Sequence, residues 1–395
     1  MFKYDVIIVG GGIVGLTAAS LLARQNLQIA VIDPSTTNSI TKLRVCAYNH
    51  ASLAVFDKLG ILQDLKNKSC YYNDVVVWQH TKAAKLHFSA STLGYNNLGA
   101  IISNYDVIES LSKNLKGRSN VVFYKGKSAI KCYRQKKYNV ITLDDGSDIM
   151  AKLLIGADGK KSWLRQQLEI TAIHEQYNQE AFIATISTQH SHQHTAWQSF
   201  QTTGPLALLP LNDLNRCSIV WTLSKNKAQH VKNLNKKDFA SQLVKYSDNV
   251  LGNIEISSDI NYYPLSSMHA SKYIAEGIAL LGDAAHVIHP LAGQGVNAGI
   301  IDCLSLVSAI FSLDDFCTES QKAIIKYQSQ RRGFNASLLF VMSQLNKLFA
   351  TNNNIGANVI DFGLAIVAKS NFSKRVFAKH ALGINKDTYF MLSKI

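Results

Sequence analysis

The sequence predicts an α/β fold: a Rossmann-like domain with an inserted, mostly antiparallel β-sheet domain and a helical C-terminal part. Three observations predict it. A glycine-rich turn follows an apolar run near the N-terminus, short strand-like runs dominate the middle of the chain, and glycine-anchored turns with helical periodicity return afterwards. Apolar strands that alternate with helices are typical of a parallel sheet, whereas closely spaced short strands indicate an antiparallel sheet.

The first segment contains a β-turn-α-β unit. Val6 to Val9 form a continuous apolar run, as expected for a buried parallel strand. Gly10 permits the tight turn that follows, Gly12 lets a pyrophosphate approach the backbone, and Gly15 lets the next helix pack closely. The second strand, 29–33, ends in Asp33, roughly 20 residues after the glycines, where a carboxylate can bind the hydroxyls of an adenosine ribose.

The same apolar stretch has a competing interpretation as a signal peptide or a membrane span. Asp5 stands where a signal peptide carries basic residues, and clustered glycines suit a turn better than a span. The second strand, 29–33, also follows the glycines at the distance expected for a nucleotide-binding unit. The sequence therefore favours a nucleotide-binding turn.

Composition limits the remaining classes. The 395 residues are 47% apolar and 17% charged, which is ordinary for a globular enzyme of two or three structural units. The six cysteines form no C-x-x-C pair, so the usual zinc and iron–sulfur patterns are absent, no metal is predicted, and a reducing cytoplasm is the expected location.

The net charge of +14 raises the question of a polyanionic partner. The lysines are spread along the chain without a nucleic-acid-binding motif, so no nucleic-acid partner is predicted. Attraction to the inner face of an anionic membrane or to acidic partner proteins stays open. Four basic residues of one expected helix lie near the apolar run 338–341, and they are expected at the surface, either as an ordinary exposed charged turn or against a membrane: Lys322, Lys326, Arg331 and Arg332.

Periodicity and turn residues predict the elements between the glycine motifs. Helices are expected over 50–59 and 104–115, a strand pair over 75–79 and 86–89, and strands around 121–123, 129–133, 138–143 and 152–155. From position 181 to about 268 short strands are expected at 182–187, 196–201, 206–209 and 218–223, with a helix near 239–246. A strand over 278–281 and a helical C-terminal third follow.

Two further glycine motifs each follow a predicted strand. The second is Gly156-Ala157-Asp158-Gly159, and the third begins with Gly282-Asp283 and continues to Asn297. A carboxylate at the end of a strand, such as Asp283, can accept hydrogen bonds from ribityl hydroxyls. The helix that begins near Pro290 would direct its unpaired N–H groups at the N1–C2 edge of a flavin, where a positive helix end stabilises the reduced anion.

The third motif carries a family resemblance. The run from Gly282 to Asn297, GDAAHVIHPLAGQGVN, resembles the FAD-contacting segment of the 4-hydroxybenzoate hydroxylase superfamily, and its second half is similar to the ubiquinone-biosynthesis hydroxylases. The run 204–211, Val220-Trp221 and 263–265 are similar to substrate-domain strands of that family, and Arg44 to its flavin-contacting arginine. Two departures are Asp33, where glutamate is more usual, and Lys160-Lys161, which replace a small or polar pair.

The resemblance implies a single-component flavoprotein monooxygenase. NAD(P)H would reduce FAD as a transient co-substrate, O2 would add at C4a, and the hydroperoxide would hydroxylate a polyprenylated phenol or quinol in ubiquinone biosynthesis. No catalytic base is assigned, although Tyr48, His50, His286 and His289 are chemically able. The residues expected to contact the cofactors are Gly10, Gly12, Ile13, Val14, Gly15, Asp33, Arg44, Asn104, Asp158, Gly159, Arg165, Gly282, Asp283, Pro290, Gly293, Gln294, Gly295, Val296 and Asn297.

Two alternatives stay open. A hydroxylase of small aromatic acids would need a buried arginine in the substrate sheet for the carboxylate. Arg216 is the only arginine between 181 and 271, and its position beside a turn counts against this alternative. The other alternative is a non-catalytic flavin-binding component of a biosynthetic assembly. The expected domain limits are FAD-binding segments at 1–74, 95–178 and 271–350, a substrate-domain hairpin at 75–94, the substrate domain at 179–270 and a C-terminal helical segment at 351–395.

Overall fold

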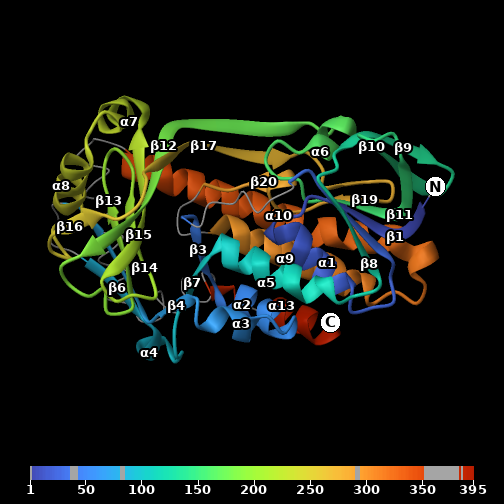
Figure 1. Ribbon diagram of the computed structural model, residues 1–395, viewed down its shortest axis with the longest axis horizontal. Coiled ribbons are helices and arrows are strands. Elements are labelled where there is room, and N and C mark those ends of the chain that lie inside the picture. The colour runs from blue at the N-terminus through green and yellow to red at the C-terminus, as the bar shows by residue number, and fades with distance from the viewer. Residues whose placement is uncertain (1, 36–42, 81–84, 290–293, 351–381, 384–385) are drawn as a thin grey trace.

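A mostly parallel sheet forms one end of the molecule (Figure 1). The computed structural model describes residues 2–35, 43–80, 85–289, 294–350, 382–383 and 386–395. Five strands lie in the order β19-β11-β1-β2-β8 and are all parallel, as buried apolar runs predict. Their bounds are β1 Phe2–Val9, β2 Ile29–Asp33, β8 Val121–Lys125, β11 Asp148–Gly156 and β19 Ile278–Leu280, with antiparallel β9 Ala129–Gln135, β10 Tyr138–Leu143 and β18 Ile274–Ala275 at the margin.

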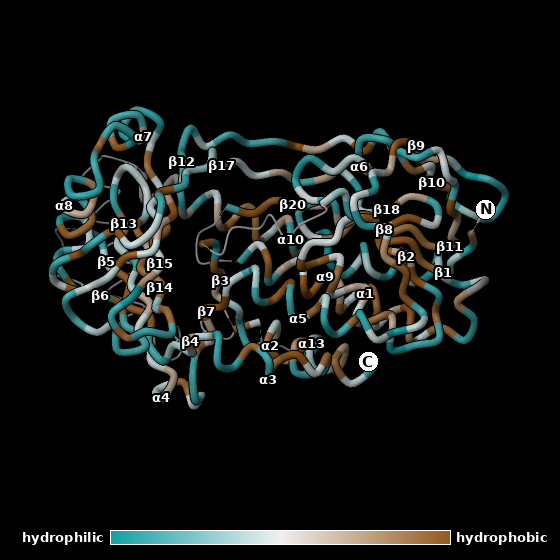
Figure 2. Tube along the Cα trace, viewed as in Figure 1, coloured by the Kyte–Doolittle hydropathy of each residue, from teal (hydrophilic) through white to brown (hydrophobic). Residues whose placement is uncertain are grey.

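Helices pack beside this sheet and bury the largest apolar cluster (Figure 2). Helix α1 (Ile13–Leu22) contacts α5 (Asn104–Lys116) and α9 (Gln294–Ile310), which in turn contacts α10 (Phe316–Ala350). Shorter helices complete the layer: α2 His50–Lys58, α3 Leu62–Lys66, α6 Trp163–Gln167 and α13 Lys386–Lys394, with the 3-10 turn η1 Gly282–Ala284. The apolar faces expected of α2 and α5 are buried in this cluster.

A nine-stranded sheet forms the other end of the molecule and has its own apolar core (Figure 1). All its pairings are antiparallel except that between β5 and β13. Its strands are β5 Asp74–Gln79, β6 Lys85–Ser89, β12 Ala172–Thr188, β13 Thr195–Phe200, β14 Leu206–Pro210, β15 Arg216–Ser224, β16 Ile254–Ile256, β17 Asn261–Ala270 and β20 His286–Val287. Helices α4 Ala90–Leu93, α7 Lys225–Lys232 and α8 Lys236–Tyr246 accompany it.

A small sheet, β3 (Val45–Tyr48), β7 (Gly99–Ser103) and β4 (Ser69–Tyr72), lies between the two larger ones. Two long strands, β12 and β17, also run from one end of the molecule to the other (Figure 1). Their pairing register shifts between Gln176 and Glu180, close to the expected limit between residues 178 and 179. The division into an FAD-binding and a substrate part remains a prediction.

Most expected elements are present. The small sheet of β3, β7 and β4 was not expected, and β12, β11, α8 and α7 also differ from the expectations. Strand β12 begins ten residues before the expected start at 182. Its early part was not expected because the alternation of buried and exposed residues is interrupted where the pairing becomes irregular, around 177–179. Strand β11 begins at Asp148 and not at 152, and α8 begins at Lys236, where Asn235 caps it, and not near 239. Helix α7 was not expected, because its lysine-rich sequence has only two buried residues, Ala228 and Val231.

Candidate functional site

The first glycine turn is closely packed except at one position. Gly10 has φ +110°, and a Cβ there would lie 2.3 Å from the carbonyl oxygen of Ala157. A Cβ on Gly15 would lie 1.9 Å from the carbonyl oxygen of Gly10. A Cβ on Gly12 would meet no atom within 4 Å. The turn therefore excludes side chains where strand and helix meet, and leaves open space at the position expected to face a phosphate.

The helix that follows this turn offers backbone donors. Helix α1 begins at Ile13, and no side chain caps it at Gly12. Unpaired N–H groups and the positive end of the helix dipole make such an N-terminus suited to an anion. Val14 packs against Gly282 and Gly299, where added Cβ atoms would lie 3.0 Å and 2.7 Å from its methyl carbon.

Asp33 ends β2 directly beside the glycine turn. A Cβ on Gly11 would lie 2.0 Å from Asp33 Oδ2. The carboxylate therefore packs directly against the backbone of Gly11, where a larger side chain would not fit. Its Oδ1 accepts hydrogen bonds from the backbone N–H of Ser35 at 3.0 Å and from the Ser35 hydroxyl at 2.7 Å. One carboxylate oxygen is thus oriented by the local turn, and the other lies next to the glycines.

The second motif lies beside the first because β11 pairs with β1. The N–H of Ala157 donates to the carbonyl of Val9 at 2.8 Å. Asp158 Oδ2 accepts from the N–H of Leu164 at 3.0 Å, while its buried Oδ1 has no hydrogen-bond partner among the described residues. Gly159, with φ +80°, turns the chain toward α6. The unpaired oxygen is a candidate ligand contact.

Arg165 connects the second motif to the third. Its guanidinium is buried and donates to the carbonyl of Lys160 at 2.9 Å and to that of Ala284 at 2.8 Å. Burial lowers the pKa of this arginine, and the nearby Asp158 opposes that shift. The side chain therefore positions two backbone turns.

The third motif completes the arrangement. The N–H of Leu281 donates to the carbonyl of Gly156 at 2.8 Å, which places the second and third turns side by side. Asp283, in the turn η1, is exposed by its overall accessibility. Desolvation by the surrounding protein raises the pKa of the Asp283 carboxyl. Electrostatic interactions with His286, Arg44 and Lys160 oppose that shift. Three distant sequence motifs thus meet at one end of the parallel sheet.

Arg44 and Asn104 lie together at the start of β3 and α5. The N–H of Asn104 donates to the carbonyl of Arg44 at 2.9 Å. The side-chain oxygen of Asn104 is buried and accepts from the Tyr48 hydroxyl at 3.1 Å. Arg44 is exposed, and its charge acts on both Cys46 and Asp283. His50, by contrast, bonds to the carbonyl of Asn97 at 2.8 Å.

The expected flavin-facing helix is α9, which begins at Gln294. Pro290 and Gly293 lie outside the described residues, while Gly295 has no atom within 4 Å of an added Cβ and Val296 packs against the core. The Asn297 side-chain oxygen accepts from the Asn49 N–H at 3.1 Å and the Ser52 hydroxyl at 2.7 Å, and its nitrogen donates to the Ala47 carbonyl at 2.8 Å. This side chain joins α9 to the segment between β3 and α2.

A buried ionic network behind the third motif was not found by sequence reasoning. Asp302 of α9 is 0% exposed, and its Oδ2 contacts His286 Nε2 at 2.5 Å and accepts from the N–H of Gly282 at 3.2 Å. Its Oδ1 accepts from Arg331 Nε at 2.8 Å and from Asn335 Nδ2 at 3.2 Å. Burial alone would raise the pKa of Asp302, but His286 and Arg331 outweigh it and lower that pKa to about 2.

This network corrects the expectation that Arg331 belongs to a surface-exposed basic cluster. Arg331 is 7% exposed and serves as the counterion of Asp302, whereas Lys322, Lys326 and Arg332 are exposed. The sequence signal that could have found the pair is the acid in an otherwise apolar helix 294–310. Such a charge needs a partner, because an unpaired buried charge is costly.

The two histidines of the third motif have different surroundings. His286 belongs to the Asp302 network, whereas His289 is 0% exposed and its Nε2 lies 3.3 Å from the side-chain oxygen of Gln179. The Tyr177 ring packs edge-on at 4.7 Å between centroids. Burial lowers the pKa of His289 to about 4, with Glu175 opposing, so the imidazole is neutral at pH 7.

The fold and the three converging turns define a dinucleotide-binding flavoprotein. Among solved structures, the fold is similar to that of p-nitrophenol 4-monooxygenase PnpA from Pseudomonas putida, with a TM-score of 0.82 at 17% identity, covering 98% of this chain and 100% of that one. At this identity the likeness shows the fold.

Sequence comparison shows the family. Residues 3–339 match the family described as FAD binding domain. The chain is 30% identical to the 3-demethoxyubiquinol 3-hydroxylase of Escherichia coli, covering 96% of this chain and 98% of that protein. It is also 30% identical to the mouse mitochondrial ubiquinone biosynthesis monooxygenase COQ6, covering 88% and 84%. The chain belongs to this family of FAD-dependent aromatic hydroxylases, which act with NAD(P)H and O2. Among the described residues, no helix is long and apolar enough to span a membrane.

Proposed function

We propose that this enzyme hydroxylates the aromatic ring of a polyprenylated phenol or quinol intermediate in ubiquinone biosynthesis. The observation that carries the proposal is the 30% identity to the Escherichia coli hydroxylase over nearly the whole of both chains. In the overall reaction one atom of O2 enters the ring and the other leaves as water, while NAD(P)H supplies two electrons. The bound flavin supplies the redox chemistry, and the protein supplies position and exclusion of water.

The proposal assigns FAD to the three converging turns. The open space at Gly12 fits a pyrophosphate on the N–H groups of Ile13 and Val14, and the free side of Asp33 fits an adenosine ribose. The unpaired oxygen of Asp158 adds a buried acceptor. These features fit a dinucleotide better than a mononucleotide, because they extend the site well beyond the third motif.

The remaining contacts would be made by the third motif and by α9. Asp283 would accept hydrogen bonds from ribityl hydroxyls, and the first turn of α9, from Gln294 to Val296, would place backbone N–H groups and a positive helix end at the flavin ring. Arg165 and Asn297 would hold these segments in position, since their side chains donate hydrogen bonds to backbone carbonyl groups of the protein. Arg44 and Asn104 would border the flavin from the β3 side.

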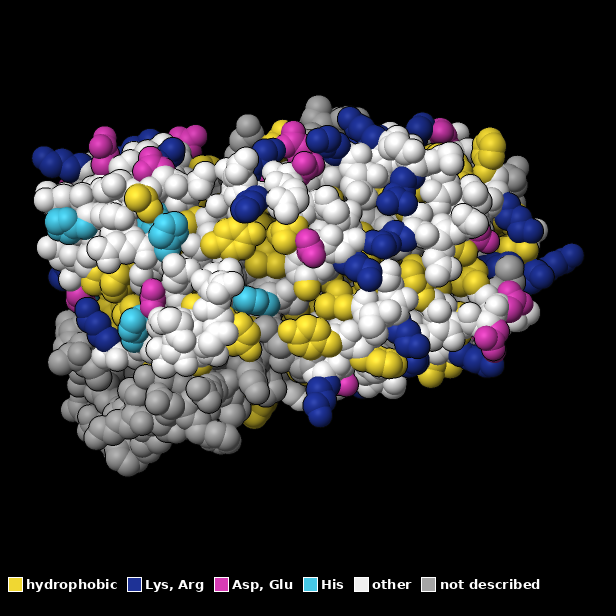
Figure 3. All heavy atoms as spheres, turned by 90° about the horizontal axis from the view of Figure 1, so that it is seen from below, with side chains coloured by type: hydrophobic (Ala, Val, Ile, Leu, Met, Phe, Trp, Pro, Cys, Tyr) yellow, Lys and Arg dark blue, Asp and Glu magenta, His cyan; other side chains and the backbone are white. Residues whose placement is uncertain are grey.

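The same proposal places the protein in the cytoplasm, at the inner face of the membrane that holds its substrate. Helix α10 exposes apolar side chains near basic ones: Phe340 is 64% exposed and Val341 49%, and Arg332 is exposed on the same helix. On the face in Figure 3, basic side chains are likewise scattered among apolar ones. Such a surface suits weak contact with anionic lipid, which high salt should reverse.

The test is NADPH-dependent oxygen uptake by the purified protein, with identification of the product by mass. A prenylated phenol and 4-hydroxybenzoate should be compared side by side. The prenylated compound should be used far better, because each buried methylene of its tail contributes about 0.8 kcal/mol. Hydroxylation of the small acid alone, with no product from the prenylphenol, would assign the chain to the aromatic-acid hydroxylases.

A further inference from the structure

A cavity of about 470 Å³ lies between α3, α5 and β8. Its volume is within the range of small-molecule sites, about 300–1,000 Å³, but most such sites are lined by apolar side chains. This lining consists of four lysines, two carboxylates and two serines. A ligand of the cavity must therefore be recognised by charge and by hydrogen bonds.

The charges of the lining do not cancel. Its two carboxylates, Asp64 and Glu109, are paired with lysines of the same cavity at 3.4 Å and 2.9 Å. The other two lysines, Lys116 and Lys125, are exposed and form no ion pair with any residue that the structure describes. The cavity therefore presents two positive charges without counterions, which attract an anion.

Ser110 adds a hydrogen-bonding group at the inner wall of the cavity. It belongs to α5, is 4% exposed, and nevertheless lines the cavity. Its hydroxyl makes no hydrogen bond within the described part of the chain. A buried polar group without a partner is costly, and most such groups in proteins have one. The inner wall therefore offers a hydroxyl to a polar ligand atom.

One side of the cavity adjoins the adenosine end of the proposed FAD site. Lys125 ends β8 and is paired in register with Asp33, which ends β2. Asp33 is the residue proposed to bind the adenosine ribose of FAD. An anion beside Lys125 would therefore lie next to the FAD site without occupying it.

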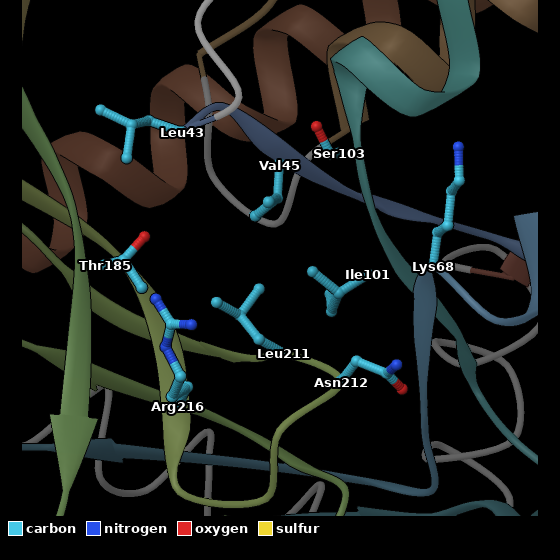
Figure 4. Close-up of a pocket in the computed structure, with 9 residues that line it drawn as sticks. All are labelled: Leu43, Val45, Lys68, Ile101, Ser103, Thr185, Leu211, Asn212 and Arg216. Carbon is cyan, nitrogen blue, oxygen red and sulfur yellow. The ribbon is translucent and has the colours of Figure 1, made fainter. Parts of the chain in front are cut away.

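The other side of the cavity extends toward the flavin end. Lys68 also lines a smaller cavity of about 290 Å³, where Figure 4 shows it on the wall opposite Thr185. The smaller cavity is also lined by Ser103, which directly precedes Asn104, a residue proposed to border the flavin. From Asn104 to Lys116, helix α5 spans about 18 Å at 1.5 Å per residue. A dinucleotide held by a phosphate near the end of α5 can therefore extend to the flavin.

We propose that the cavity between α3, α5 and β8 binds the 2′-phosphate of NADPH, and that the enzyme distinguishes NADPH from NADH there. This inference rests on the proposed function and narrows its co-substrate. A phosphate monoester carries about 1.5–2 negative charges at pH 7 and three acceptor oxygens, which match two lysines and a serine hydroxyl. NADH has a hydroxyl at the same position and would leave both lysines without a counterion.

The experiment uses 2′,5′-ADP and 5′-AMP, which differ only in the 2′-phosphate, and inorganic phosphate as a third probe. Dissociation constants for the FAD-loaded enzyme are measured by titration calorimetry, together with the Tm of each protein. The proteins are the wild type, Lys116→Gln, Lys125→Gln, Ser110→Ala and Lys131→Gln.

Lys131→Gln is the matched control. Lys131 is exposed and lies over the Tyr133 ring at 5.2 Å, much as Lys125 lies over the Phe123 ring at 5.6 Å. Its strand, β9, is at the opposite margin of the sheet from β8. The Tm checks Lys116→Gln in particular, because Lys116 is in the last turn of α5, where a cation also stabilises the helix dipole.

The wild type should bind 2′,5′-ADP more tightly than 5′-AMP. Lys116→Gln and Lys125→Gln should each reduce this preference up to about fivefold, as expected for one solvent-accessible ion pair. Ser110→Ala should reduce it about fivefold through one lost hydrogen bond, and Lys131→Gln should keep it. In the oxygen-uptake assay the KM for NADPH should rise in the same three variants, while the KM for NADH stays unchanged.

Equal binding of the two nucleotides by the wild type, or an unchanged preference in Lys125→Gln and Ser110→Ala, would overturn the proposal. Inorganic phosphate that binds as tightly as 2′,5′-ADP, and weakens in the same variants, would make free phosphate the ligand and would also overturn it. Absence of hydroxylated product from every aromatic compound would overturn the proposed function alone, because the nucleotide probes bind without turnover.

Discussion

Replacing Asp302 with asparagine should destabilise the fold and weaken FAD binding together. Asparagine has nearly the same shape, but it removes the negative charge that Arg331 faces at 2.8 Å. It also presents an NH2 group where Gly282, His286 and Asn335 all approach the carboxylate. The substitution therefore leaves a buried cation without its counterion and creates opposing donors.

The expected loss follows from the burial of both partners. Removing one member of a buried ion pair costs about 3–5 kcal/mol. For a chain of 395 residues this corresponds to a fall in Tm of about 4–6 °C, from an unfolding entropy of about 2.1 cal/mol/K per residue. The Gly282 N–H loses a charged acceptor beside Asp283, so the dissociation constant for FAD should rise up to about tenfold.

The assay is thermal unfolding of the apo-protein, with FAD affinity measured by quenching of flavin fluorescence. Glu276→Gln is the matched control, because it removes one partner of the exposed pair with Arg134 and should change stability by less than about 1 kcal/mol. The pKa of Asp302 is lowered to about 2, so its contribution is complete above pH 4 and is lost as the pH falls toward 2. This reasoning would be refuted if the Asp302→Asn protein had the same Tm and the same dissociation constant for FAD as the wild type.

Three further predictions follow from the site. Gly12→Val should fold, because the space at Gly12 is open, but its side chain should prevent FAD binding. Gly15→Val should fail to fold, because a Cβ there would lie 1.9 Å from the carbonyl oxygen of Gly10. Stoichiometric FAD in the absorbance spectrum of folded Gly12→Val would contradict the phosphate assignment. Asp283→Ala should weaken FAD binding roughly 10- to 200-fold with little change in apo-protein Tm, and equal affinity by titration would exclude it as a ribityl acceptor. Since the pKa of His289 is lowered to about 4, its neutral form stabilises the fold above pH 6.5, and this contribution decreases as the pH falls toward 4. His289→Asn should therefore make unfolding measured between pH 6.5 and 4 less dependent on pH, and an unchanged slope would count against a buried neutral imidazole.

The glycine turns were predictable because their requirements are local. A positive φ at Gly10, the close packing at Gly15 and the open space at Gly12 all follow from a strand-turn-helix sequence. The apolar faces of α2 and α5 were predictable from helical periodicity for the same reason. The early part of β12 was not, because the irregular pairing near Asn178, which has φ +50°, interrupts the alternation on which a strand is recognised.

Tertiary ion pairs lie beyond such local patterns. Asp302 and Arg331 are 29 residues apart on different helices, and the sequence shows only that one acid interrupts an apolar run. Arginines are mostly exposed in proteins, so the basic residues of α10 were all expected at the surface. Which of them turns inward depends on where α9 places its carboxylate, and this is a property of helix packing.

Two arginines show how partners decide what a charge can do. Arg331 is buried because Asp302 and Asn335 accept its hydrogen bonds, so its donors are occupied and its role is to hold the third motif. Arg216 stands at the edge of a cavity with no acceptor among the described residues, so its donors remain available. Desolvating a guanidinium is favourable only when an anion compensates it. The fold therefore buries Arg331, which has an acid partner, and leaves Arg216, which has none among the described residues, at the surface.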